Sequence, residues 1–323
     1  MAKQFDYLVV GAGLYGSTFA RIATDKGKSC IVIDKRNHIA GNCYTEKCHN
    51  IDVHKYGAHL FHTNDKEVWD FVNRFSEFNQ YRHQVIVKSG NVHYSFPPNK
   101  MTYQQLGTTN KQVLYKKLFK GYTEKMWGKE RKDVIRRIPI RNDWDNKYFS
   151  DKYQGIPIDG YTKLVERMLT GIKVQLNCPF RWDQITTKKI VYSGPIDSLF
   201  GFMYGRLPYK SLCFKTKMYN KKQVQGIGVI NYADKDVPYI RTVEHKYFNW
   251  IESRRTIVTT EYSTEQGEEF YPILDSENIN LYNKYKKLLS NDFILGGRLG
   301  SYRYMDMDEV VKQAIEHTNR ISR

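Results

Sequence analysis

Residues 6–34 read DYLVVGAGLYGSTFARIATDKGKSCIVID, and this stretch decides the fold of the chain. It opens with a short apolar run of the kind found in buried parallel strands, and then breaks into a G-x-G-x-x-G turn at residues 11–16. A helical pattern of apolar residues follows the turn and stops at Gly27. A second apolar strand, residues 30–33, ends in Asp34. The stretch therefore predicts a strand–turn–helix–strand unit that binds a dinucleotide.

Each glycine of the turn has its own task in such a unit. Gly11 makes the tight turn, Gly13 lets the backbone approach a pyrophosphate, and Gly16 lets the helix pack against the strand. The helix N-terminus attracts the phosphates, and Asp34 accepts hydrogen bonds from the ribose hydroxyls. Glycine-rich turns are common, so an ordinary βαβ unit is the alternative. The strand before, the helix after and the acid about twenty residues on favour the dinucleotide.

The residues after Asp34 bear on which dinucleotide is bound. They continue as KRNHIAGN, with Gly41 in a turn, and this extension resembles the FAD fingerprint of glutathione-reductase-like flavoproteins. No second G-x-G-x-x-G follows a strand elsewhere in the chain. A single fingerprint favours a permanently held FAD, with electrons arriving from the substrate or from a separate donor.

Composition narrows the class of protein. The chain has 323 residues, of which 41% are hydrophobic, so we expect two or three folded domains rather than disorder. It has no long apolar run, it enters its first strand at once, and its five cysteines lack metal-type spacing. We therefore expect no membrane span, no signal peptide, reduced thiols and a cytoplasmic location.

The net charge of +17 comes from 51 basic and 34 acidic residues. The basic residues are dispersed along the chain, without a long run or a recognisable nucleic-acid module. The charge therefore favours a positive field that attracts phosphate-bearing small molecules, rather than nucleic acid, as the partner.

Several longer strings identify a family. They read HKYGAHLFHT (54–63), KGYTEKMWG (120–128), RIPIR (137–141), NKYFSDKYQGIPIDGYTKL (146–164), YSGPID (192–197), VPYIR (237–241) with EHK (244–246), and GGRL (296–299) with YRYMDM (302–307). With these strings the chain resembles the UDP-galactopyranose mutase family over nearly its whole length.

The resemblance implies a flavoenzyme that interconverts UDP-galactopyranose and UDP-galactofuranose, an isomerase supplying galactofuranose for cell-surface glycans. In this family the N5 atom of reduced FAD attacks the anomeric carbon as UDP leaves, and the N5–sugar adduct opens and recloses with another hydroxyl. An external reductant, such as NAD(P)H, is needed. The implied fold is α/β: a glutathione-reductase-like FAD-binding Rossmann domain, a small helical insertion and an antiparallel β-sheet domain. The segments are FAD-binding at 1–78, 159–204 and 285–323, β-sheet at 79–96 and 205–284, and insertion with the uridine-binding string at 97–158.

The resemblance also implies site residues. Arg137 and Arg241 match the two diphosphate-binding arginines, and a guanidinium suits that task because its planar fork meets phosphate oxygens bidentately. Catalytic roles fall on Arg137, Arg241, Tyr304, Asp306 and His59, beside the flavin N5. Substrate contacts fall on His83, Tyr122, Thr123, Trp127, Arg137, Tyr148, Asn231, Arg241, Tyr271 and Tyr304. Cofactor contacts fall on Gly11, Gly13, Leu14, Tyr15, Gly16, Asp34, Lys35, Gly41, Asn42, His59, Leu60, Gly297, Arg298, Asp306 and Met307.

Other interpretations stay open at this level. His59 and His62 form an H-x-x-H pair, but no third ligand stands at metal-binding spacing, so we expect no metal site. An FAD-dependent oxidase of the amine-oxidase type, a UDP-binding protein without turnover, or a mutase of another UDP-sugar such as UDP-N-acetylgalactosamine are the alternatives. The stretch from Pro98 to Tyr115 is shorter than in bacterial members of the family. Because that insertion carries much of their dimer contact, we expect a monomer or a non-standard homodimer.

Overall fold

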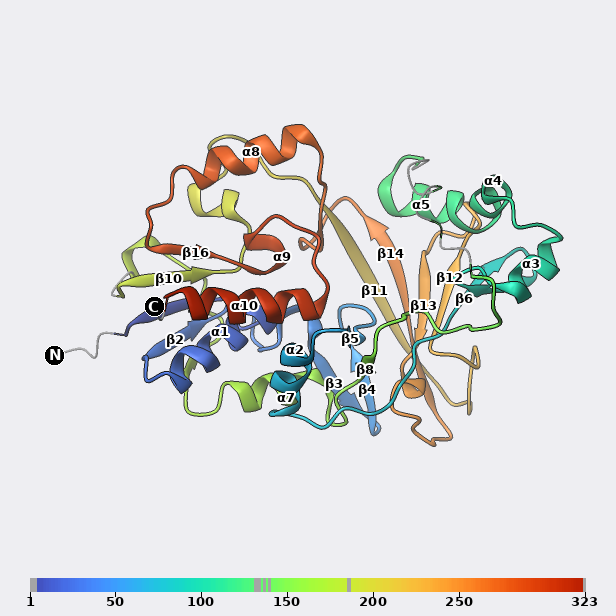
Figure 1. Cartoon of the computed structure of the whole chain (residues 1–323), viewed down its shortest axis with the longest axis horizontal. Helices are drawn as coiled ribbons and strands as arrows, with labels where there is room; N and C mark the ends of the chain where they lie inside the picture. Colours follow the sequence, from blue (N-terminus) through green and yellow to red (C-terminus); the bar gives the residue numbers. More distant parts are fainter. Residues whose placement is uncertain (1–4, 131–134, 136–137, 139–140, 185–186, 322–323) are drawn as a thin grey trace.

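The computed structural model describes residues 5–130, 135, 138, 141–184 and 187–321. Figure 1 shows an elongated molecule with a small parallel sheet and its helices at one end. A larger sheet with a group of short helices makes up the other end. The chain crosses between the two ends several times, so segments that are far apart in the sequence lie side by side in each.

The first sheet has five parallel strands in the order β16-β10-β1-β2-β9. They span Tyr7–Val10 (β1), Cys30–Ile33 (β2), Lys173–Gln175 (β9), Lys189–Tyr192 (β10) and Phe293–Leu295 (β16). The side chains of Val9, Val32 and Val191 are fully buried, as the continuous apolar runs of a sheet covered on both faces require. The fingerprint strand β1 is therefore central, and the predicted Rossmann-type α/β architecture is confirmed.

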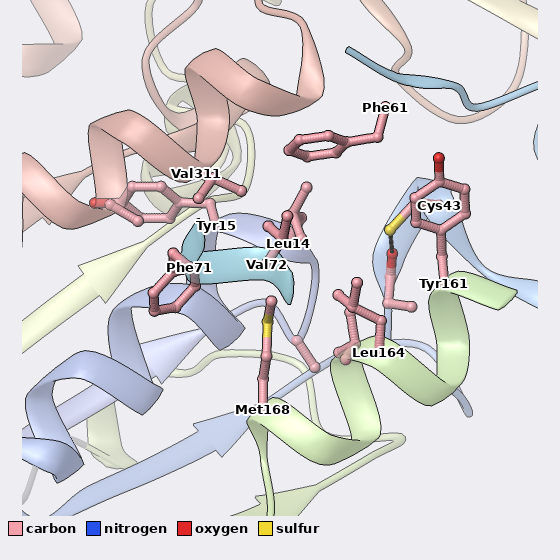
Figure 2. Packing of buried hydrophobic residues seen from close by; sticks show 14 of the residues in the cluster. Leu14, Tyr15, Cys43, Phe61, Phe71, Val72, Tyr161, Leu164, Met168 and Val311 are labelled. Atoms are coloured by element: carbon pink, nitrogen blue, oxygen red, sulfur yellow. Dashed lines mark hydrogen bonds between the residues drawn. The ribbon is translucent and has the colours of Figure 1, made fainter. Parts of the chain in front are cut away.

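Helices pack against this sheet and form its core. They are α1 (Leu14–Asp25), α2 (Lys66–Asn73), α7 (Gly160–Met168), α8 (Ser276–Lys286), α9 (Gly297–Gly300) and α10 (Met307–Ile321). Figure 2 shows Leu14, Val72, Leu164 and Met168, from three of these helices, pointing toward one another. The helix that directly follows the glycine turn is thus fixed by apolar packing along its length.

The second sheet has seven strands in the order β15-β11-β14-β13-β12-β6-β7. They span Val85–Ser89 (β6), Val92–Phe96 (β7), Tyr209–Tyr219 (β11), Val229–Tyr232 (β12), Arg241–Glu244 (β13), Thr256–Thr264 (β14) and Tyr271–Pro272 (β15). The pairs are antiparallel except for β12 and β6, which are parallel. A parallel pair needs a long crossover connection, and the segment between β6 and β12 supplies it.

The helical insertion is broken rather than continuous. The pattern predicts helix from Met101 to Trp127, and the structure has α3 (Lys100–Leu106), α4 (Lys111–Leu114), a π-helical turn (Tyr115–Phe119) and α5 (Lys120–Trp127). Gly107 ends α3 in the left-handed conformation, with φ of 66°. Asn110 begins α4 by accepting a hydrogen bond from the Gln112 N–H. These two caps divide the predicted helix.

Four short strands and four single turns complete the part of the chain that the structure describes. The strands pair as β3 (Thr45–Cys48) with β4 (Ile51–His54), and as β5 (Phe61–Thr63) with β8 (Tyr153–Gly155). The 3-10 turns span Gly41–Cys43, Trp182–Gln184, Ile196–Phe200 and His245–Tyr247. The domain boundaries given from the sequence stay predictions.

Within the part of the chain that the structure describes, every helix is too short or too polar to cross a membrane.

Candidate active site

The glycine turn lines a cavity of about 500 Å³ at the carboxyl ends of β1, β2 and β10. This is where ligands bind in open α/β sheets, and the volume is within the range of cofactor sites. Gly13 and Asp34 line one part of it, and His59 and Arg298 line another. The cavity therefore continues from the fingerprint to the two residues expected beside the flavin.

The structure explains the presence of the three fingerprint glycines in two different ways. A Cβ atom on Gly11, whose φ is 107°, would lie 2.1 Å from the Ser193 Oγ, and one on Gly16 would lie 2.0 Å from the Gly11 carbonyl oxygen. The fold itself therefore requires these two glycines. A Cβ on Gly13 would meet nothing nearer than the Gly41 Cα at 3.6 Å, an ordinary contact. Packing alone does not demand Gly13, which leaves close approach by a ligand as its reason.

The start of α1 is open to an anion. Gly13 is its N-cap, no side chain caps the helix, and its first turn has no acidic residue. Free N–H groups at a helix N-terminus attract phosphate. Asp34 accepts hydrogen bonds from the backbone N–H groups of Ala12 (2.8 Å) and Arg36 (2.9 Å), which hold its carboxylate in the cavity wall. Each oxygen keeps a lone pair for a ribose hydroxyl.

An ion pair between two loops borders the cavity. Arg36, in the loop after β2, pairs with Glu268, in the loop between β14 and β15, and both line the cavity. The Arg36 guanidinium also lies 4.6 Å from the centre of the Tyr56 ring, and it donates to the Asn42 Oδ1 at 2.9 Å. Stacking and hydrogen bonding thus hold Arg36 in place independently of Glu268.

Arg298 organises the far end of the cavity. Its Nε and Nη2 atoms donate to the Met305 carbonyl oxygen at 3.2 and 2.7 Å. Its guanidinium lies over the rings of Tyr271 and Tyr304, at 4.9 and 5.2 Å from their centres. These two rings are stacked on each other with centres 5.8 Å apart. A cation and two tyrosines expected to contact the substrate are therefore one packed unit.

His59 lines the cofactor cavity beside Arg298 and is neutral. Its backbone N–H donates to the His54 Nδ1 at 3.0 Å, and its own Nδ1 is hydrogen-bonded to the Gly57 carbonyl oxygen at 2.9 Å. Burial is the largest of the effects that lower the pKa of His59 to about 4; the charges of Arg298 and Arg241 act in the same direction, and the hydrogen bond to Gly57 opposes them. The imidazole is therefore uncharged at neutral pH, close to both guanidinium groups.

Arg241, on β13, is held from two sides. Its Nε donates to the Oδ1 of Asn231, its register partner on β12, at 3.1 Å, and its Nη2 donates to the Tyr122 hydroxyl at 3.0 Å. The Glu261 carboxylate is 3.8 Å away. Burial lowers the pKa of Arg241, but Tyr122 and Glu261 raise it and the net shift is upward. A permanently charged guanidinium with oriented donors suits a diphosphate.

His83 and Tyr148 form a buried wall near Arg241. The Tyr148 backbone N–H donates to the His83 carbonyl oxygen at 2.7 Å, and their rings are 5.4 Å apart. Burial lowers the pKa of His83 to about 3, and the charge of Arg241 contributes. Burial also raises the pKa of the Tyr148 hydroxyl, while Arg241 opposes that rise. Both side chains are therefore neutral, and the charge of Arg241 shifts the pKa of each.

The short helix α5 carries the predicted uridine string. Tyr122 reaches Arg241, while Thr123 is buried and its hydroxyl donates to the Lys120 carbonyl oxygen at 2.9 Å. Lys125 fixes the helix to the sheet domain, because its Nζ donates to the carbonyl oxygens of Tyr232 and Tyr239 at 2.9 and 2.8 Å. Burial lowers the pKa of Lys125 to about 8. Trp127 is the last residue of α5 and is half-buried.

Most of the predicted cofactor residues line the one cavity. They are Gly11, Gly13, Leu14, Tyr15, Asp34, Lys35, Gly41, Asn42, His59, Gly297, Arg298 and Met307. Gly16 packs beneath the Gly11 carbonyl group, and Leu60 packs against the core. Asp306 precedes α10 and donates its backbone N–H to Glu309. Arg137 lies outside the described residues.

Several residues of the site were not predicted. Phe180, Trp182 and Glu268 line the cavity, and no local string marks them. His62, the second histidine of H-x-x-H, is hydrogen-bonded through its Nδ1 to Asp151 at 2.7 Å and stacks on Phe149 with ring centres 3.7 Å apart. The H-x-x-H string contains His62, but its partner Asp151 lies in a distant segment that no spacing indicates.

Comparison with known proteins gives two family matches. Residues 117–304 match the family model of UDP-galactopyranose mutases, and residues 9–75 match that of NAD(P)-binding Rossmann-like domains. The second match covers the glycine turn and the strand that ends in Asp34.

Individual relatives cover almost the whole chain. A dTDP-fucopyranose mutase of Escherichia coli is 33% identical over 96% of this chain and 96% of its own. A probable UDP-galactopyranose mutase of Klebsiella pneumoniae is 33% identical over 96% of this chain and 92% of its own. The crystal structure of a reduced UDP-galactopyranose mutase has the same fold, with a TM-score of 0.76 at 14% identity, covering 99% of this chain and 96% of the other.

Proposed function

The chain belongs to the UDP-galactopyranose mutase family, and we propose that it is an isomerase that interconverts UDP-galactopyranose and UDP-galactofuranose with the help of bound FAD in its reduced form. The observation that carries this proposal is that His59 and Arg298 line the far part of the cofactor cavity, and that the charge of Arg241 also acts on His59. A half-buried cation for a diphosphate thus adjoins the far end of a dinucleotide cavity.

The residues present fit FAD. The cavity has an uncapped helix N-terminus for the pyrophosphate, the carboxylate of Asp34 for a ribose, and Gly13 where packing alone requires no glycine. Arg298 would favour the anionic, reduced state of a flavin at the other end. When bound in reduced form, the cofactor supplies a nucleophile for the anomeric carbon of the sugar.

The side chains of this protein bind and orient the substrate. Arg241 holds the diphosphate and favours its departure from the sugar, because it stays charged at every working pH. The family resemblance assigns the second diphosphate contact to Arg137. Tyr122, Thr123 and Trp127 on α5 hold the uridine, and the hydrogen bond from Arg241 to Tyr122 ties the base-binding helix to the diphosphate site.

The sugar lies among neutral groups in this proposal. His83, Tyr148, Tyr271 and Tyr304 enclose it, with Asn231 as a further polar contact. Burial raises the pKa of Tyr271 and of Tyr304 and lowers that of His83, so each stays uncharged and does not compete with the diphosphate for Arg241. The charge of Asp306 acts on Tyr148 and Tyr304, and burial raises the pKa of Asp306.

A thymidine-linked sugar is the second candidate substrate. The relative from Escherichia coli is named a dTDP-fucopyranose mutase, and it matches this chain as well as the UDP-galactopyranose mutase relatives do. A mutase of UDP-N-acetylgalactosamine and an amine-oxidase-type flavoenzyme remain further alternatives.

The deciding experiment uses purified protein reduced with dithionite under anaerobic conditions. UDP-galactofuranose, dTDP-fucofuranose and UDP-N-acetylgalactosamine are offered separately, and the products are separated by ion-exchange chromatography. We expect conversion of UDP-galactofuranose to the pyranose only in the reduced protein. Preferential conversion of the dTDP sugar would favour the second candidate. Peroxide formation in air with an amine, without any mutase activity, would contradict the proposal.

The reductant, the cellular location and the oligomeric state are proposed from three separate observations. We propose that NAD(P)H or another external donor reduces the flavin, since the chain has one dinucleotide fingerprint. We propose a cytoplasmic location, supported by five cysteines that are all free thiols. A monomer or a non-standard homodimer is proposed because the insertion consists of short helices interrupted at residues 107–110. Light scattering at micromolar concentration checks the last point, and a dimer closed through α3–α5 would contradict it.

A further inference from the structure

A second cavity, of about 760 Å³, lies between α8, β16 and α10. We call it the C-terminal cavity. It lies outside the proposed substrate and cofactor sites, and none of the family strings points to a ligand there. Tyr282 and Lys286 contribute from α8, Phe293 and Leu295 from β16, and Gln313 and His317 from α10.

The lining of the C-terminal cavity combines apolar and cationic groups. Leu274 and Ile279 line it although they are 47% and 43% exposed. The basic lining residues are Lys286, Arg303, His317 and Arg320, and among the residues that the structure describes no carboxylate lines the cavity. Exposed apolar side chains beside cations are typical of a site for an amphipathic anion.

The nearby acidic residues are already engaged, one of them with the lining residue Arg320. Glu316 lies 3.8 Å from Arg320, Asp292 pairs with Lys189 at 3.0 Å, and Asp275 caps α8 by accepting from the Asn278 N–H. Lys286 and Arg303 have no ion-pair partner among the residues that the structure describes. These two cations are therefore available to an external anion.

The C-terminal cavity shares a wall with the cofactor cavity. The Tyr15 hydroxyl is 2.8 Å from the His317 Nδ1, and the Gly297 N–H donates to the Gln313 Oε1 at 2.8 Å. Tyr15 and Gly297 line the cofactor cavity, whereas His317 and Gln313 line the other. A Cβ on Gly296 would lie 1.8 Å from the Tyr15 ring, so ring and backbone are in tight contact. Figure 2 shows Tyr15 beside α10, where Val311 also points inward.

We propose that the C-terminal cavity binds a small amphipathic organic anion. Its charged group lies near Lys286 and Arg303, and its apolar body lies against Leu274 and Ile279. The bound anion bridges α8 to α10, and it holds His317 and Gln313 against Tyr15 and Gly297. Occupation of this site thereby stabilises the wall of the cofactor cavity and slows the release of the cofactor.

The binding test uses the FAD-loaded protein and the fluorescent anion 8-anilinonaphthalene-1-sulfonate. We expect Lys286→Gln and Arg303→Gln each to weaken its binding at least about tenfold, as loss of a charge-assisted contact does. Lys284→Gln, on the same helix but outside the lining, is the matched control and should bind normally. Equal binding of the uncharged N-phenyl-1-naphthylamine, or displacement of the probe by UDP, would overturn the proposal.

The coupling test measures how fast FAD leaves the protein, by filtration and flavin absorbance, with and without saturating probe. We expect the probe to slow release at least twofold in the unchanged protein. In Gln313→Leu the probe should still bind, but the rate should no longer respond to it. If the probe leaves the rate of FAD release unchanged in the protein without substitutions, occupation of the C-terminal cavity does not stabilise the wall that it shares with the cofactor cavity. Because both readouts are independent of turnover, they distinguish this proposal from the proposed mutase activity.

Discussion

The hydroxyl of Tyr122 lies 3.0 Å from the Nη2 of Arg241. This contact joins α5 of the helical insertion to β13 of the sheet domain inside the proposed substrate site. Arg241 therefore has a structural task as well as its proposed binding task, and substitutions at the two positions separate them.

Replacement of Arg241 by alanine should weaken substrate binding by about 1.5–3 kcal/mol, the worth of a hydrogen bond to a charged group. Lysine should restore part of this, because it keeps the charge but lacks the fork. Tyr122→Phe is the control, since it removes the hydroxyl and leaves the guanidinium. Steady-state kinetics of the reduced enzyme give the measurement, and unchanged KM and kcat in Arg241→Ala would show that the diphosphate binds elsewhere.

Gly13→Val should fold but lose FAD. The Cβ has room within the protein, at 3.6 Å from the Gly41 Cα, whereas the added side chain occupies the path of the pyrophosphate. Gly16→Val is the contrasting variant, because its Cβ would lie 2.0 Å from a carbonyl oxygen and the fold itself should fail. Circular dichroism and flavin absorbance of the purified proteins measure both effects. Stoichiometric FAD in Gly13→Val would remove this assignment.

Glu268→Gln should speed the release of FAD by a factor of about five at most. Glu268 is 44% exposed at its side chain, and exposed ion pairs are worth about 1 kcal/mol or less. Arg36→Met should have the larger effect, since Arg36 also contacts Tyr56 and Asn42. Glu265→Gln, in the same loop but 86% exposed, is the control. If Arg36→Met releases FAD at the original rate, the ion pair does not hold FAD in the cavity.

The buried histidines should make the protein sensitive to acid. Burial lowers the pKa of His83 and of His245 to about 3 and that of His59 to about 4, below the ordinary value of 6.5. Between these values the unfolded chain binds more protons than the folded one. Stability is therefore complete above about pH 6.5 and falls as the pH drops toward 3, by about 1.4 kcal/mol per pH unit for each such histidine.

Urea unfolding at several pH values measures this slope. In His83→Asn the dependence of the unfolding free energy on pH between pH 6 and 4 should decrease by about 1.4 kcal/mol per pH unit, which is the contribution of one proton. Replacement of the exposed His93 by asparagine should leave this slope unchanged. Comparison of variants removes the contribution of carboxylates, which also titrate in acid. Identical slopes in all three proteins would contradict the burial of a neutral His83.

The sequence predicts those parts of the site that are local. The glycine turn, Asp34 and the order of the fingerprint elements lie within one short segment, where turn chemistry and apolar periodicity suffice. The contact between Arg36 and Glu268 joins residues 232 positions apart, and that between His62 and Asp151 joins residues 89 apart. Such pairs depend on how the domains come together, and no spacing rule describes that. The break in the predicted helix at Gly107 and Asn110 shows the opposite case, because the glycine and asparagine caps that divide the helix are local signals within a continuous apolar pattern.

The parallel pairing of β6 with β12 has a consequence for how the protein is made. Strand β6 ends at Ser89 and β12 begins at Val229, so a chain still being translated exposes one edge of the β6–β7 hairpin for the time in which about 140 residues are added. The parallel sheet is completed later still, because its strand β16 ends only at Leu295. Neither sheet can be completed before its last strand, β15 or β16, has been made, and an unpaired strand edge in that interval is open to association with other chains. Yield of native protein should therefore depend on the supply of chaperones that cover such edges.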